Sequence, residues 1–102
     1  MDKEYVIGKE KNITGLGMRY YRLLAGLSIP ELTEELAKKD IFIDSANFGK
    51  IERQERGVAD YIVKAVSDIV KQNVEKMYED LTPEQILFIE ENNRKRKPKS
   101  EK

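Results

Sequence analysis

Two helix-start signals constrain what this chain of 102 residues can fold into. At 28–31 the sequence reads Ser-Ile-Pro-Glu, and at 82–85 it reads Thr-Pro-Glu-Gln. In both, the hydroxyl can accept a hydrogen bond from a free backbone amide, and the Glu or Gln three residues on can reach back to the first residue. Pro fits the first turn because no hydrogen bond is lost there. Each signal therefore predicts that a helix begins.

The spacing of apolar residues predicts helices along most of the remaining chain. They recur every three or four residues, as on one face of a helix. Five or six short helices are expected, beginning near Asn12, Ser28, Ser45, Asp60, Val74 and Thr82. A small apolar island at 5–7 fits either an arm or one short strand, and no other strand can be placed. The expected fold class is all-α, a compact bundle of five or six short helices.

The connection before the third helix, residues 40–44, is apolar between two acids. It is too short to form a helix of its own, so we expect its side chains to point into the core. The helix that follows is expected to turn Phe48 and Ile51 toward the core, and Gly49 and Lys50 toward solvent.

Charge is balanced over the whole chain, with 19 Lys and Arg against 19 Asp and Glu, but it is not balanced along it. Residues 13–58 carry seven of each sign, whereas residues 59–93 carry eight acids and three bases. Residues 94–102 hold six bases and one acid. The net charge of zero thus conceals an acidic region and a basic tail, and it does not exclude binding to nucleic-acid phosphates.

A chain of this length supports one modest core and one domain. We expect an N-terminal arm over 1–12, the core domain over 13–79, a C-terminal helix over 80–93 and a disordered basic tail over 94–102. The C-terminal helix has more apolar residues than one face requires. Two explanations stay open for it: packing on its own core, and contact with a second copy of the chain in a homodimer.

His and Cys are both absent. The chain therefore lacks the usual acid–base group of neutral pH, a thiol nucleophile, soft metal ligands and any disulfide. Gly15-Leu16-Gly17 is no nucleotide-binding loop, because the preceding strand and the third glycine are missing. No apolar run approaches the roughly 20 residues of a membrane span. We expect a cytoplasmic protein with no catalytic activity, no metal, no cofactor and no contact with a membrane.

Two groups of short motifs lie in the middle of the chain. The first group is Gly15-Leu16-Gly17-Met18-Arg19-Tyr20-Tyr21-Arg22, Gly26-Leu27-Ser28 and Leu32. The second group is Ile43-Asp44-Ser45, Lys50-Ile51-Glu52, Arg56-Gly57-Val58 and Asp60-Tyr61. Over residues 13 to about 78, these motifs and their spacing resemble the Cro/Xre-type, phage-repressor-like family of helix-turn-helix domains. The turn between the two motif helices is longer than is usual, as in one sub-group of that family.

The resemblance implies a lambda-repressor-like bundle in which a recognition helix, about 45–53, enters the major groove of DNA. It places these residues toward bases or phosphates: Ser45, Ala46, Asn47, Gly49, Lys50, Arg53 and Arg56. Lys50 is the best candidate for a base edge, because its amine can reach O6 and N7 of guanine, while Asn47 suits adenine or a phosphate. Arg22 and Glu52 match positions at which the family has an ion pair between the first helix and the recognition helix. We predict that contact here.

Two functions remain open at this point. The first is a sequence-specific DNA-binding transcriptional regulator, a repressor or an activator, of bacterial or phage type, which binds double-stranded DNA as a homodimer. The second is a protein-interaction module on a helix-turn-helix scaffold that has lost DNA binding. It is suggested by Ile29, where the family commonly has Gln, by Ala46 and Gly49, which lack hydrogen-bonding side chains, and by the acidic excess over 59–93. The sequence names no small-molecule effector.

Overall fold

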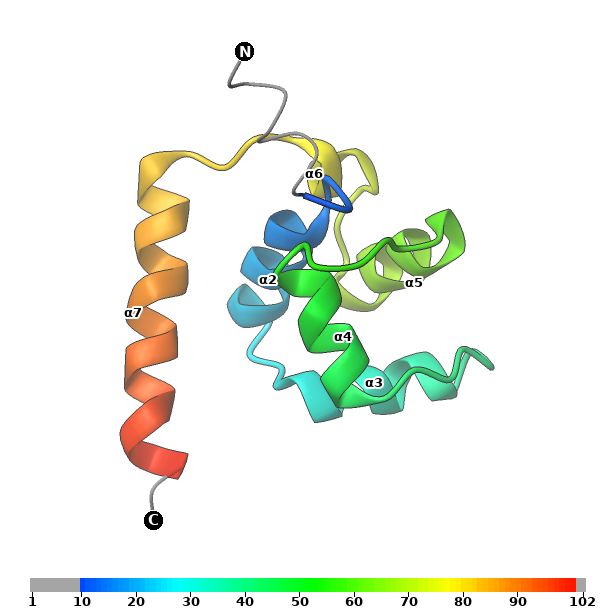
Figure 1. The fold of residues 1–102 in the computed structure, drawn as a ribbon, viewed down its shortest axis with the longest axis horizontal. Coiled ribbons are helices and arrows are strands. Elements are labelled where there is room, and N and C mark those ends of the chain that lie inside the picture. The colour runs from blue at the N-terminus through cyan, green and yellow to red at the C-terminus, as the bar shows by residue number, and fades with distance from the viewer. Residues whose placement is uncertain (1–9, 101–102) are drawn as a thin grey trace.

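Six α-helices and no strand make up the part of the chain that the structure, a computed structural model, describes: residues 10–100, with side chains to residue 92 (Figure 1). In chain order they are α2 (Gly15–Leu24), α3 (Ile29–Ala37), α4 (Ser45–Glu52), α5 (Asp60–Val70), α6 (Glu75–Tyr78) and α7 (Pro83–Ser100). The all-α class predicted from the sequence is confirmed. Most of the arm predicted over 1–12 lies outside the described residues.

Both predicted helix-start signals form the expected reciprocal hydrogen bonds. At the start of α3, the Glu31 amide donates to Ser28 Oγ at 3.1 Å, and the Ser28 amide donates to Glu31 Oε1 at 2.8 Å. At the start of α7, Gln85 and Thr82 make the same pair of bonds, at 3.2 and 2.8 Å. These bonds satisfy amides that have no partner within the helix, so they decide where each helix begins.

The core lies where α2, α3, α4, α5 and α6 meet. Its most deeply buried apolar side chains, each no more than 1 % exposed, are Met18, Leu32, Leu36, Phe48, Ile51, Val63, Val66 and Met77. Burying one such side chain stabilises a fold by about 1.5–3 kcal/mol. Phe48 and Ile51 turn inward as predicted, which leaves the opposite side of α4 in contact with solvent.

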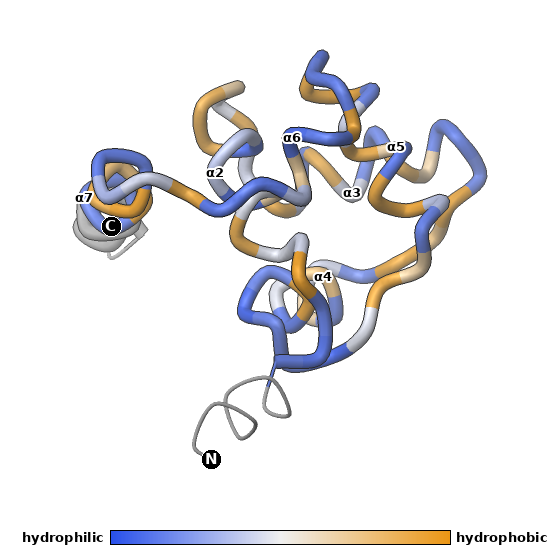
Figure 2. Tube along the Cα trace, turned by 90° about the horizontal axis from the view of Figure 1, so that it is seen from above, coloured by the Kyte–Doolittle hydropathy of each residue, from blue (hydrophilic) through white to orange (hydrophobic). Residues whose placement is uncertain are grey.

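Helix α7 lies to one side of the other helices and packs along α2 (Figure 2). The ring of Phe88 on α7 meets the ring of Tyr20 on α2 edge to face, with centroids 5.5 Å apart. Ile89 is buried, whereas its neighbours Ile86 and Leu87 are 42 % and 50 % exposed. The contact with α2 therefore covers one face of α7 and leaves another apolar face open to solvent.

The sequence predicts a disordered basic tail over 94–102. In the structure, α7 instead continues through Ser100. Lys and Arg at 94–97 are good helix formers and favour this continuation, whereas Pro98 opposes it. Residues 101 and 102 lie outside the described part of the chain.

The connection between α3 and α4 corrects one expectation from the sequence. Ile41 and Ile43 pack against the core as expected, but Phe42 between them is 79 % exposed. Alternate side chains of an extended segment point to opposite sides, so three consecutive apolar residues there cannot all face inward. Phe42 is the one that faces solvent.

Candidate nucleic-acid interface

Helix α4 presents several of the sequence-predicted site residues on its solvent side. It begins after Asp44, whose Oδ1 accepts a hydrogen bond from the Asn47 amide at 2.7 Å. Ala46 and Lys50 are exposed, and so is Arg53, which caps the C-terminal end of the helix. Six of the residues that the sequence predicts to contact DNA thus lie on this helix and the turn after it, and all six are exposed or half-buried: Ser45, Ala46, Asn47, Lys50, Arg53 and Arg56.

The side-chain amide of Asn47 is partly occupied within the protein. Its Nδ2 donates to Asp44 Oδ2 at 3.2 Å, in addition to the backbone bond that caps the helix. The Asn47 carbonyl oxygen makes no hydrogen bond with a described residue. A base or phosphate that uses both ends of this amide would have to replace the bond to Asp44.

Gly49 is not turned toward solvent, and this prediction from the sequence is wrong. It is buried within α4, because the side chains of Arg53 and Ile29 cover it. A Cβ atom added at Gly49 would lie 3.3 Å from Arg53 Nη1 and 4.0 Å from Ile29 Cδ1. Gly49 therefore makes room for these two side chains and presents none of its own.

The predicted contact between Arg22 and Glu52 is present and is almost fully buried. Arg22 Nε donates to Glu52 Oε2 at 2.7 Å, and Arg22 Nη2 donates to Oε1 at 2.9 Å. Their side chains are only 5 % and 3 % exposed. Arg22 Nη1 donates to the Leu27 carbonyl at 2.7 Å, so the same guanidinium also holds the turn between α2 and α3. This bidentate pair ties α4 to α2.

Arg19 is a site residue that sequence reasoning missed. Its Nε lies 4.0 Å from Glu52 Oε1, too far for a hydrogen bond, and it is buried with no hydrogen-bond partner among the described residues. Burial lowers the pKa of Arg19, while the nearby Glu52 carboxylate acts in the opposite direction. Helical spacing was the available signal, because Arg19 stands three residues before Arg22 and so shares its face of α2.

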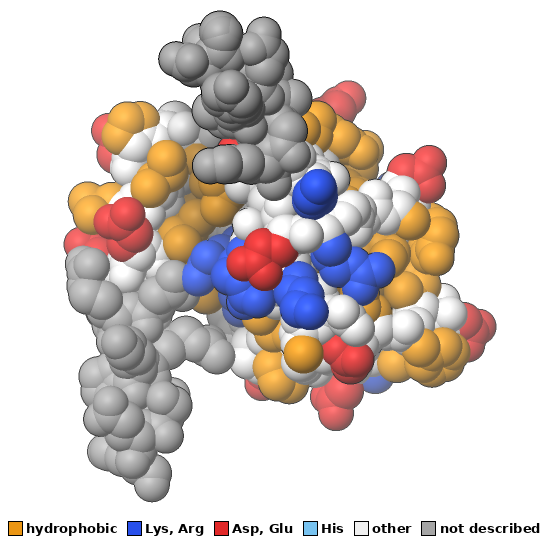
Figure 3. Space-filling model, in the orientation of Figure 1, with side chains coloured by type: hydrophobic (Ala, Val, Ile, Leu, Met, Phe, Trp, Pro, Cys, Tyr) orange, Lys and Arg blue, Asp and Glu red, His pale blue; other side chains and the backbone are white. Residues whose placement is uncertain are grey.

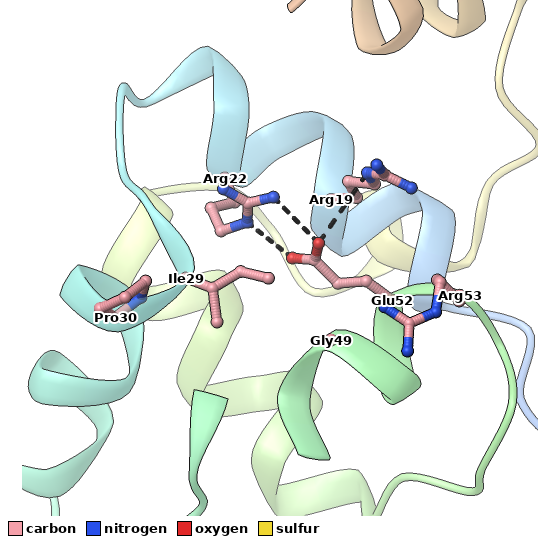
Figure 4. A pocket seen from close by; sticks show the side chains of 7 residues that line it. All are labelled: Arg19, Arg22, Ile29, Pro30, Gly49, Glu52 and Arg53. Atoms are coloured by element: carbon pink, nitrogen blue, oxygen red, sulfur yellow. Dashed lines mark hydrogen bonds and ion pairs between the residues drawn. The ribbon is translucent and has the colours of Figure 1, made fainter. Parts of the chain in front are cut away.

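A pocket of about 310 Å³ opens between α2, α3 and α4 (Figure 4). Its lining residues are Arg19, Arg22, Ile29, Pro30, Gly49, Glu52 and Arg53. Figure 4 shows Arg19 and Arg22 reaching from α2 toward Glu52 on α4, with Ile29 of α3 on the other side. Three guanidinium groups thus share this pocket with one carboxylate.

Arg53 makes an exposed ion pair with Glu55. Its Nε and Nη2 donate to the two carboxylate oxygens at 2.9 and 3.3 Å, and both side chains are about half exposed. This hydrogen-bonded contact raises the pKa of Arg53 and lowers the pKa of Glu55. Exposed pairs of this kind contribute little to stability. Arg53 is therefore free to exchange Glu55 for another anion at little cost.

Asn12 holds the start of α2 against the end of α4, a second role that sequence reasoning missed. Its Oδ1 accepts from the Gly15 amide at 2.7 Å, and its Nδ2 donates to the carbonyls of Ile51 and Arg56, each at 2.9 Å. At Gly15 an added Cβ would collide with the Ile51 carbonyl oxygen. The close approach of the two helices thus requires glycine at this position.

The basic side chains of this region lie together on one face of the molecule. Figure 3, in the orientation of Figure 1, shows Lys and Arg side chains gathered near the centre of that face, with acidic groups among them. Within the described residues, no ion pair or hydrogen bond occupies the side chains of Lys50 and Arg56, which are both exposed. We name the surface formed by Arg19, Lys50, Arg53 and Arg56 the basic face.

No family model, curated protein or solved structure matches this chain. Among the described residues, no helix is both long and apolar enough to span a bilayer. In that same part of the chain, no group of three or more acidic side chains is placed to hold a metal ion.

Proposed function

We propose that this protein is a sequence-specific DNA-binding transcriptional regulator of bacterial or phage type. It acts in the cytoplasm and inserts α4 into the major groove of double-stranded DNA. One observation carries the proposal: Phe48, Ile51 and Glu52 hold α4 from behind, and Lys50 and Arg53 lie on its exposed side. The major groove, roughly 12 Å wide, admits one helix in this way.

The groups on the basic face suit two kinds of contact. Lys50 carries an unpaired ammonium on a flexible stem, which suits O6 and N7 of guanine. Arg53 and Arg56 follow at the end of α4 and just beyond it, and they suit backbone phosphates. Ser45, Ala46 and Asn47 lie at the start of the same helix, where side chains of a recognition helix meet base edges.

A homodimer follows from the small size of this contact surface. One short helix reads only a few base pairs, whereas two copies related by a two-fold axis read half-sites one helical turn apart. The apolar face of α7 supports such a dimer, because Ile86 and Leu87 remain exposed after α7 has packed on α2. Exposed apolar groups at adjacent positions suit a self-complementary contact between two copies.

Changing Leu87 to Glu is expected to convert the dimer to a monomer, because a charge would be buried in the apolar contact. Sedimentation velocity would report this as a fall to the mass of one chain. Phe42→Glu is the matched control, since Phe42 is also an exposed apolar residue but lies in the connection before α4. A wild-type chain that sediments as a monomer would contradict the dimer, and so would equal effects of the two variants.

Selection of bound duplexes from a random pool is the direct test of the function. We expect a recovered motif with two related half-sites. We also expect log Kobs to fall linearly with log salt concentration, by about 0.9 per phosphate contacted. The net charge of zero predicts modest affinity for unrelated DNA. Undetectable or salt-independent binding to every duplex in the pool would overturn the proposal.

A protein-interaction module is the second candidate function, and two observations favour it. The Asn47 amide is partly occupied by Asp44, and Gly49 is buried, so few groups on α4 are available to read bases. Apolar side chains are also exposed away from α4, notably Phe42 and Tyr61, at 79 % and 62 %. Recovery of a stoichiometric protein partner without DNA from the native cytoplasm would favour this function over the first.

A further inference from the structure

The pocket between α2, α3 and α4 contains one more guanidinium group than its carboxylate can hydrogen-bond: Arg19, whose side chain is 23 % exposed, lies 4.0 Å from Glu52. Both oxygens of Glu52 accept from Arg22, at 2.7 and 2.9 Å, and the remaining Arg22 nitrogen donates to the Leu27 carbonyl. Arg22 and Glu52 therefore satisfy each other. Arg19 is the additional cation, and its buried Nε has no hydrogen-bond partner among the described residues. Because the Arg19 side chain as a whole is partly exposed, its guanidinium group can turn toward an anionic ligand that supplies the missing acceptor.

A second donor reaches the pocket from α4. Arg53 uses Nε and Nη2 to bind Glu55, which leaves Nη1 available. Nη1 lies over Gly49, 3.3 Å from the position where a Cβ would stand, and both residues line the pocket. The absence of a side chain at Gly49 thus lets the Arg53 guanidinium lie against the pocket wall.

The chemistry of these donors points to a phosphate group. Guanidinium groups are planar, remain charged, and match the oxygens of phosphate with two parallel N–H bonds. Arg19 comes from α2 and Arg53 from α4, so a ligand between them would receive donors from two directions. A phosphodiester has two free oxygens and can accept from both. Ile29 and Pro30 form an apolar wall on the α3 side of the pocket.

We propose that this pocket binds one backbone phosphate of duplex DNA, held by the guanidinium groups of Arg19 and Arg53. The inference rests on the proposed function and extends it to a residue of α2. DNA is the favoured source of the phosphate because Gly49 lies in α4, Arg53 caps its C-terminal end, and Lys50 directly follows Gly49. The phosphate contact of Arg53 and the groove contact of Lys50 thus come from residues three positions apart.

Substitution of Arg19 by Met is expected to lower the affinity for DNA about tenfold, because one hydrogen bond from a charged group to a phosphate is lost. The loss should be the same for specific and random-sequence duplexes, because a phosphate contact does not depend on base sequence. The slope of log Kobs against log salt concentration should become less steep by about one. Fluorescence anisotropy over a range of salt concentrations measures both. Lys64→Met removes the same charge from α5, where Lys64 pairs with Asp68, and should change neither quantity appreciably. Thermal unfolding of both variants shows whether the fold is kept.

NMR titration of the wild-type chain tests the same site without any substitution. The Nε–Hε resonance of Arg19 is expected to shift when a random-sequence duplex is added, while that of Arg22, already bound to Glu52, moves less. Inorganic phosphate at millimolar concentration provides the second titration. Duplex binding with no response of Arg19 and no change of salt slope in Arg19→Met would overturn the pocket assignment and leave the DNA-binding proposal standing.

The two proposals fail in different ways. If inorganic phosphate shifts the Arg19 resonance and no duplex does, the pocket binds a small phosphate compound, which contradicts DNA as its occupant. If neither ligand shifts the resonance and no duplex binds, both the proposed function and this site are wrong.

Discussion

Replacement of Arg22 by Met is expected to lower the free energy of unfolding by about 3–5 kcal/mol, because it leaves the buried Glu52 carboxylate without its bidentate partner. Glu52 is only 3 % exposed, so water entering from the pocket can replace only part of the lost donors. Arg19, at 4.0 Å, offers partial compensation. Total stabilities of small domains are roughly 5–15 kcal/mol, so this one change would remove a large share. Urea unfolding measures the loss.

A double-mutant cycle isolates the pair itself. Arg22→Met combined with Glu52→Met removes both charges, and it should be less destabilised than the sum of the single variants, because no unpaired charge remains. Lys64 and Asp68 form the control pair, at 2.7 Å with side chains 61 % and 45 % exposed. Their coupling is expected to stay below about 1 kcal/mol. A coupling for Arg22 and Glu52 as small as that of the control would contradict a structural role for the pair.

Substitution of Lys50 by Ala is expected to relax specificity at one base pair of each half-site. A good contact to a base edge contributes about 1–3 kcal/mol of discrimination, roughly a 5- to 150-fold preference. Lys50 is exposed on α4 and pairs with no side chain in the described part of the chain, so its removal should leave the fold intact. Competition between the selected duplex and duplexes changed at single positions measures the preference, and thermal unfolding verifies the fold.

Arg56→Ala provides the comparison for Lys50. Arg56 is exposed beyond the end of α4, and among the described residues its only hydrogen bond is the one that its carbonyl accepts from Asn12. Its loss should weaken binding to all duplexes alike and make the salt slope less steep by about one. If Lys50→Ala also weakened every duplex equally, Lys50 would be a phosphate contact, and the assignment of base reading to it would be wrong.

Much of the fold was predictable because helix starts depend on residues close together in the chain. The caps at Ser28 and Thr82 use a partner three residues on, and the structure has both. The inward positions of Phe48 and Ile51 also follow from local periodicity. The same reasoning failed for Phe42, because spacing alone does not say which of three consecutive apolar residues an extended segment turns outward.

The candidate site was predictable only in part. The contact of Arg22 with Glu52 spans 30 residues of sequence, and only the resemblance to a known family pointed to it. Neither the burial of Gly49 nor the position of Arg19 was anticipated. Both depend on how α2, α3 and α4 pack, since Ile29 covers Gly49 and Glu52 lies near Arg19.

The sequence by itself determined that this chain is all-α, where α3 and α7 begin, and that acidic and basic residues are segregated along it. These properties arise from hydrogen bonds within one turn, from apolar periodicity and from composition. Only the tertiary structure decided that Asn12 joins the start of α2 to Ile51 and Arg56, and that three guanidinium groups meet in one pocket. Such arrangements depend on close packing between residues about 30–45 positions apart, which no local pattern specifies.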